Sequence, residues 1–163
     1  MKSILFIIVF FLSATASFSQ WAILKSDADS LVRQGANHIY NVEFDSAEVA
    51  FQQVIERYPE HPAGYFLQAM VDFWRLTLYR YTDKINDDFL RKIGKVIEVS
   101  DKLLNENQYD ITGLFFKGGA LGYRARFYTN EKQWFSAASD GKEAYDILMR
   151  AHEKVPGNHD IML

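Results

Sequence analysis

Apolar positions recur at helical spacing along most of the chain. Between residues 90 and 104 the apolar side chains fall three and four positions apart, which matches the 3.6-residue turn of an α-helix. No segment shows the strict alternation of apolar and polar residues that predicts a half-buried strand. The sequence therefore predicts an all-α protein.

A pattern of small and large apolar residues indicates that the helices form repeats. Gly35 is followed by Ala47, Phe51, Val54 and Pro59. Small side chains at Gly35 and Ala47 let two antiparallel helices approach, Phe51 fills the space above them, and Pro59 ends the second helix. This arrangement resembles the tetratricopeptide repeat, and the resemblance implies an alpha-alpha superhelix of antiparallel helix pairs.

The pattern returns twice further along the chain. The seventeen residues from Gly64 align without gaps to those from Gly113, and four pairs are identical: Gly64 and Gly113, Phe66 and Phe115, Arg75 and Arg124, Tyr79 and Tyr128. In the second helices we predict that the places of Ala47, Phe51 and Val54 are taken by Ile93, Ile97 and Ser100, and then by Ala144, Leu148 and Ala151.

The spacing within the units predicts different helix lengths. The two small positions are 12 residues apart in the first unit (35 to 47), 24 in the second (69 to 93) and 26 in the third (118 to 144). Because the addition is shared by two antiparallel helices, each should be about two turns longer. We expect three helix pairs, the second and third elongated, with turns near 82–83 and 129–130. The expected units cover residues 28–61, 62–108 and 109–158, with the start of a possible fourth at 159–163.

The first nineteen residues have the layout of a secretory signal peptide. Lys2 supplies the positive charge, residues 4–12 form an apolar run too short to span a bilayer, and small residues follow. Cleavage after Ala16 and cleavage after Ser19 both fit. The expected protein is therefore exported, periplasmic or secreted, with the helical domain at 20–163 and no stable membrane span once the signal is removed. With no Cys, its stability must come from the core.

Charge and motifs exclude several functional classes. A net charge of −3 and a pI near 5.8 give no basic footprint for nucleic acid. The chain has no Cys nucleophile, no G-x-S-x-G elbow, no phosphate-binding loop and no H-E-x-x-H motif, and its four His are scattered. We therefore expect no enzyme activity, no cofactor and no metal.

The candidate site rests on the family resemblance, which implies that the first helices of each unit line a concave groove. The residues expected there are largely apolar and aromatic: Phe66, Met70, Phe73, Trp74, Arg75, Phe115, Gly119, Tyr123 and Arg124. Alternatively, Phe66 and Phe115 pack against neighbouring helices, and the two Arg lie on solvated faces. We expect Trp74 and Tyr123 to be partly exposed, because their polar tips need water or a partner.

These features predict a protein–protein interaction or scaffold module of the bacterial cell envelope that binds a peptide or helix in an apolar groove. The alternatives are a carbohydrate or other small-ligand binding module, or the N-terminal part of a longer repeat protein. We expect no polar capping helix after the third unit. Since stacked repeats normally end in such a helix, we also expect possible self-association through this end.

Overall fold

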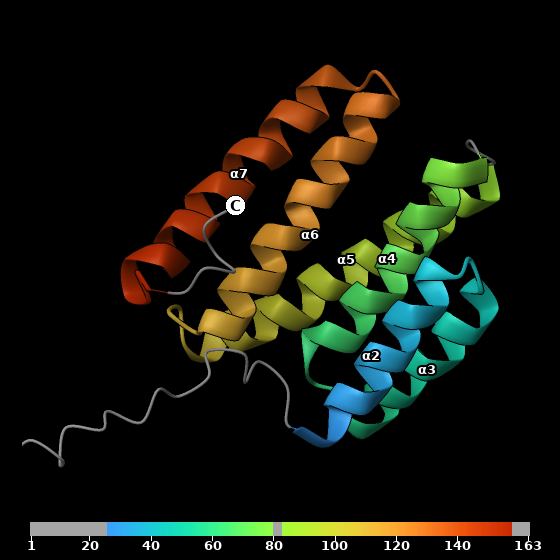
Figure 1. The fold of residues 1–163 in the computed structure, drawn as a ribbon. Helices are drawn as coiled ribbons and strands as arrows, with labels where there is room; N and C mark the ends of the chain where they lie inside the picture. The colour runs from blue at the N-terminus through green and yellow to red at the C-terminus, as the bar shows by residue number, and fades with distance from the viewer. Residues whose placement is uncertain (1–25, 80–82, 158–163) are drawn as a thin grey trace, which may run out of the picture.

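The computed structural model describes residues 26–79 and 83–157, and within these ranges the chain forms six α-helices and no strand (Figure 1). The helices are α2 (Ser26–Tyr40), α3 (Phe44–Arg57), α4 (Pro62–Tyr79), α5 (Asp83–Glu106), α6 (Ile111–Asn130) and α7 (Trp134–Lys154). The all-α prediction is confirmed. The predicted signal peptide, the predicted turn residue Thr82 and the start of a fourth unit at 159–163 lie outside the described residues.

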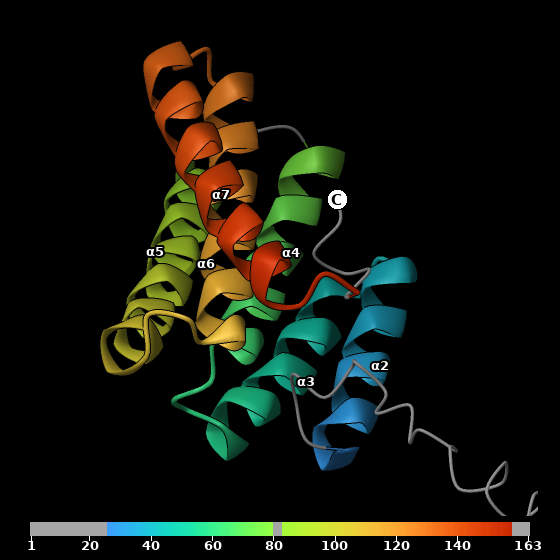
Figure 2. The same ribbon diagram turned by 90° about the vertical axis from the view of Figure 1, so that its left-hand side faces the viewer.

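The helices form three hairpins that stand side by side. Figure 1 shows α2 and α3 at one end, α4 and α5 in the middle, and α6 and α7 at the other end. The same order is visible in the view turned by 90° (Figure 2). Helix α4 packs against both α3 and α5, and α6 packs against both α5 and α7. Within the described residues, no helix is long and apolar enough to cross a membrane.

The turns at the tips of the first and third hairpins are equivalent. Backbone amides bond Asn41 to Asn37, Val42 to Ile39 and Glu43 to His38, and the same three bonds recur 90 positions later: Glu131 to Phe127, Lys132 to Thr129 and Gln133 to Tyr128. The middle residue of each turn has a left-handed backbone, with φ of 64° at Val42 and 60° at Lys132. Helix α6 continues through Asn130, so the second of these turns begins just after its predicted position.

Close helix crossings also match between these two hairpins. A Cβ atom on Gly35 would overlap the ring of Phe51, and one on Gly118 would lie 2.6 Å from Leu148. The predicted contact between Gly35 and Phe51 is thus confirmed. We compared equivalent positions of the first and third hairpins. They are 83 residues apart at the crossing in the first helices, 90 apart in the turns, and 97 apart at the crossing in the second helices. Each helix of the third hairpin therefore gains seven residues, which is about two turns and confirms the predicted elongation.

The junctions between successive hairpins repeat with an offset of 49 positions. The bonds from Tyr58 to Val54 and from His61 to Tyr58 recur as Asn107 to Leu103 and Asp110 to Asn107. Gly64 lies against Ile55 as Gly113 lies against Leu104.

This offset corrects the predicted alignment of the second helices. The α5 counterparts of Ala47, Phe51 and Val54 are Val96, Ser100 and Leu103, not Ile93, Ile97 and Ser100. A shift of three residues is close to one helical turn, so both alignments present apolar residues to the core, and periodicity alone does not separate them.

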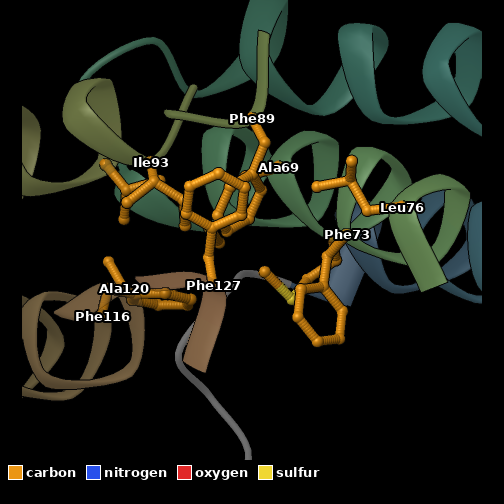
Figure 3. Close-up of a cluster of buried hydrophobic side chains, with 11 residues drawn as sticks. Ala69, Phe73, Leu76, Phe89, Ile93, Phe116, Ala120 and Phe127 are labelled. Atoms are coloured by element: carbon orange, nitrogen blue, oxygen red, sulfur yellow. The ribbon is translucent and has the colours of Figure 1, made fainter. Parts of the chain in front are cut away.

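The main core is formed by the second and third hairpins together. Buried side chains of α4, α5 and α6 converge in it (Figure 3), and the rings of Phe89 and Phe127 are 5.3 Å apart. A second cluster joins α6 to α7. The first hairpin has a smaller cluster of its own, in which Phe44, Ala47 and Phe51 of α3 pack on Val71 of α4.

Candidate functional site

The structure brings several of the predicted groove residues together between α4 and α6. The ring of Tyr123 lies 5.7 Å from that of Phe66 and 4.9 Å from that of Phe73, both in edge-to-face geometry. A Cβ atom on Gly119 would lie 3.5 Å from Phe66, so this glycine faces the same ring. We call Phe66, Phe73, Gly119 and Tyr123 the aromatic cluster.

The aromatic cluster offers little open surface. Met70 and Phe73 are both buried and belong to the main core. Phe66 and Phe115 are half-buried and pack against that core, as the alternative interpretation of the sequence expected. Tyr123 is half-buried, and Trp74 is 45% exposed beside Phe73, so the expected partial exposure of Trp74 and Tyr123 is confirmed. Ligand binding here stays a prediction.

Arg75 and Arg124 do not lie with the aromatic cluster, which corrects their predicted place. Each comes nine residues after a predicted groove Phe, and nine residues at 100° per residue lead to the opposite side of the helix. Nor are they solvated: their side chains are 19% and 26% exposed. Arg124 donates to both carboxylate oxygens of Asp140 on α7, at 2.6 and 2.9 Å.

Arg75 belongs to a network of charges that joins three helices. Its Nη1 lies 3.1 Å from Oδ1 of Asp72 and 3.0 Å from Oε1 of Glu48, and its Nη2 lies 2.7 Å from Oδ1 of Asp45. Nζ of Lys92 lies 2.7 Å from Oε1 of Glu48 and 2.7 Å from Oδ2 of Asp72. The contact with Asp72 is a close ion pair without hydrogen-bond alignment. Two cations and two carboxylates thus alternate in a closed ring.

The charges of this ring are largely withdrawn from water, so the fold requires them to pair with one another. The Asp72 side chain is 3% exposed and that of Lys92 is 15% exposed, so neither charge is well hydrated. A buried charge is tolerated where opposite charges contact it directly. Burial raises the pKa of Glu48, but hydrogen bonds from Lys92 and Arg75 outweigh that effect and hold the pKa below its ordinary value of 4.5.

Above this ring lies a cleft with a volume of about 890 Å³. Helix α4 forms its floor, and α3 and α5 form its walls. The wall from α3 is rich in acidic and amide side chains: Asp45, Glu48, Val49, Gln52, Gln53 and Glu56. The wall from α5 carries three basic side chains, Lys84, Arg91 and Lys92, together with Ile85 and with Asp88, which pairs with Arg91. We call this space the charged cleft.

The charged cleft continues toward the junction of the first and second hairpins. A second cavity of about 570 Å³ shares Gln52, Gln68, Arg91 and Lys92 with it. Lys95 extends the basic wall there, and apolar surface is added by Tyr65 and Ile55. The two cavities are therefore neighbours between α3 and α5.

The charged cleft was not predicted from the sequence. A weak signal exists, because Asp45, Glu48, Gln52 and Glu56 recur at spacings of three and four and so share one face of α3. Such a face is also what a solvated helix shows. The polar face of α3 lies opposite Arg91 only because α3 and α5 both dock on α4.

Searches against protein families, curated proteins and solved structures found no match for this chain. In the ranges that the structure describes, no three His, Asp or Glu side chains gather closely enough to hold a metal ion.

Proposed function

We propose that this chain is a non-catalytic protein-interaction module of tetratricopeptide-like type, and that it binds an extended peptide of alternating charge in the charged cleft. The observation that carries the proposal is the shape of this cleft together with the opposite charge of its two walls. This revises the location of the predicted groove, which the family resemblance placed on the aromatic side of α4 and α6.

The lining of the cleft favours an extended chain over a helix. From Asp45 to Glu56 the α3 wall is about 17 Å long at 1.5 Å per residue. The backbone N–H and C=O groups of an extended chain are free to bond the amide side chains that line the cleft, whereas a helix bonds these groups internally.

The two walls favour alternation of charge in the bound peptide. Successive side chains of an extended chain point to opposite sides. Acidic side chains would then face Lys84 and Arg91, while basic ones would face Glu56 and Asp45. About five residues span the cleft at 3.3 Å per residue.

Amide side chains supply hydrogen bonds for the peptide backbone. Gln68 of α4 donates to Gln52 of α3 at 3.0 Å. Each amide has two donor hydrogens and an acceptor oxygen, so this bond leaves capacity for a further partner. Both residues line the charged cleft and the cavity that continues it.

The proposal is tested with labelled hexapeptides of identical composition, one alternating Lys and Glu and one with three Lys followed by three Glu. Fluorescence anisotropy at low ionic strength should show that the alternating peptide binds at least about tenfold more tightly, and added salt should weaken binding. Glu56→Lys and Arg91→Glu should each weaken it. Glu153→Lys and Lys132→Glu, which make the same charge changes at exposed positions outside the cleft, should not.

Equal affinity for the two peptides would overturn the proposed selection for alternation. Equal losses from the cleft variants and their matched controls would show that only net charge matters, and would remove the charged cleft as the site.

We further propose that the module acts after export, in the cell envelope, because residues 1–19 have the layout of a signal peptide. Mass spectrometry of the mature amino end distinguishes cleavage after Ala16 from cleavage after Ser19. An uncleaved chain in the cytoplasmic fraction would contradict the export.

A further inference from the structure

The second helix of each hairpin has a face that receives the next hairpin. On α3 this face includes Ile55, which meets Gly64 of α4, and Gln52, which accepts a hydrogen bond from Gln68. On α5 the matching residues are Leu104 and Asp101, and they meet Gly113 and Lys117 of α6. In both cases a glycine lets the incoming helix start close to its neighbour.

The end of α7 is equivalent to the end of α3, so the same face can be located on it. The residue after each helix has nearly the same backbone, φ −134° and ψ 64° at Tyr58 and φ −135° and ψ 68° at Val155. Each donates its amide to the fourth residue before it. The two ends are 97 positions apart, and this offset also relates Phe51 to Leu148 at the helix crossings.

With this offset, Ile55, Gln52 and Glu48 of α3 correspond to His152, Met149 and Tyr145 of α7. On α7 the face is open: Met149 is 38% exposed and Tyr145 is 65% exposed. Trp134, also exposed, lies on the same stripe at helical spacing. Aromatic and Met side chains gathered on one exposed face are typical of surfaces that bind protein.

We propose that this face of α7 docks an amphipathic helix of a partner protein, in the way that α4 docks on α3 and α6 docks on α5. The partner helix runs antiparallel to α7 and begins near His152. It carries a small residue opposite His152. Counted from that residue, an apolar residue four positions later lies opposite Met149, and a second apolar residue eleven positions later lies opposite Tyr145. These spacings are those of Gly64, Gln68 and Arg75 on α4.

A second copy of this chain does not supply that helix at its amino end. Gly35 of α2 corresponds to Gly118 of α6, which is 83 positions later, and α4 residues correspond to α6 residues 49 positions later. Each α2 residue therefore corresponds to the α4 residue 34 positions after it. The matching positions are then Ser30 and Gln34 on α2 and Asn41 in the turn after it, all polar and exposed. The open face at α7 is apolar, whereas the open face at α2 is polar. The α2 face of a second copy is therefore a poor match, and we assign the docked helix to a different protein with an apolar helix face.

The site is separate from the charged cleft, which lies between α3 and α5. Binding at α7 therefore does not depend on the function proposed above. Variants at Tyr145 and Met149 test one surface, and variants at Glu56 and Arg91 test the other.

The probe is a peptide with the sequence of residues 110–130 in which Lys117 and Arg124 are both replaced by Leu. It keeps Gly113 at the small position and gains apolar residues four and eleven places later. Isothermal titration against the full chain should show saturable binding. Tyr145→Asp and Met149→Asp should each weaken it by at least about tenfold, because both changes place a charge in the buried interface. Tyr40→Asp, at an exposed site away from this face, should leave it unchanged.

A second peptide, with Gly113→Leu added, tests the close approach and should not bind. All chain variants are first compared by circular dichroism, and their exposed positions should leave the helical signal intact. The absence of saturable binding would overturn the proposal, as would equal binding to the wild type and the Tyr145→Asp variant. A dimer of the wild-type chain that Tyr145→Asp converts to a monomer would assign the face to a second copy and overturn the assignment to a partner.

Discussion

The two junctions between hairpins begin with the same turn and continue with opposite chemistry. At the first junction, between α3 and α4, the contact soon becomes polar, with paired amides and then the ring of charges around Asp72 and Arg75. At the second, between α5 and α6, Lys117 pairs with Asp101 near the turn, but further along the contact is apolar and contributes Phe89 and Phe127 to the main core. The backbone arrangement of a junction therefore does not decide what fills it.

Because the two junctions differ, the three hairpins are not held together equally. The second and third hairpins share one large core, whereas the first hairpin is held by its own small cluster and by charges. Burial of aromatic surface is favourable without any matching geometry, but a buried ion pair stabilises the fold only when every partner is present. The first junction should therefore depend on a specific geometry and be weakened by the loss of any one charge. The second should be more stable and should tolerate substitutions better.

The largest effect should come from emptying the second junction. Phe127→Ala removes a ring that is 3% exposed, and we expect it to lower the free energy of unfolding by about 3–5 kcal/mol. Urea denaturation followed by circular dichroism measures the change. Leu78→Ala, at an exposed site on α4, is the control and should cost less than about 0.5 kcal/mol. Similar small losses for both would contradict the dominance of this core.

The next effect should come from breaking the ring of charges. Asp72→Ala leaves Arg75 and Lys92 partly buried with only one shared carboxylate, and we expect a loss of about 3 kcal/mol, at the low end of what broken buried pairs cost. Asp146→Ala removes an exposed pair with Lys142 and should cost much less, because water screens exposed charges. If the two losses were equal in urea denaturation, the ring would contribute no more than a surface pair.

A smaller effect should separate the first hairpin from the rest. Gly35→Ala forces a methyl group against Phe51, and overpacking of this kind costs about 1–3 kcal/mol. Hydrogen exchange should show lost protection in α2 and α3 before α6. Gly94→Ala is the matched change in open space, where no atom lies within 4 Å, and should stabilise helix α5 by up to about 1 kcal/mol. Uniform loss of protection along the chain would contradict a separable first hairpin.

The smallest effect concerns acid. Because the pKa of Glu48 is lower in the folded chain than its ordinary value of 4.5, the carboxylate stabilises the fold above that pH. This contribution is lost as the pH falls through the lowered pKa. Thermal melts in an acid series should show that Glu48→Gln destabilises the chain near neutral pH and lessens its acid sensitivity. An unchanged slope of melting temperature against pH would show that Glu48 does not sense acid.

The sequence predicted the helices, the close crossings and the elongated hairpins because each follows from local rules. Gly35 and Phe51 sit at a spacing that fits a close crossing of two short helices, and extra residues between the small positions of a helix pair lengthen its helices. The α5 alignment was wrong by three residues because one turn of helix preserves the apolar face. Arg75 was misplaced because its neighbour Trp74 lies only 100° away on the helix.

The charged cleft was beyond prediction for a different reason. Its walls come from α3 and α5, which both pack against α4 and contact each other through the pair of Glu48 and Lys92. Whether Glu48 reaches Lys92 or water depends on how the second hairpin packs against the first. Charges 44 residues apart in the chain carry no local sign of that pairing.

The seven residues added to each helix of the third hairpin also set its reach. Two whole turns carry the tip about 10 Å further from the crossing at Gly118 with almost no rotation about the helix axis. Trp134 and Phe135, 61% and 94% exposed, are thereby held out at the end of a stiff arm. The length of the hairpin thus sets the distance of its tip from the crossing. Removing seven residues from each helix would shorten this distance while the crossing and the turn keep their form.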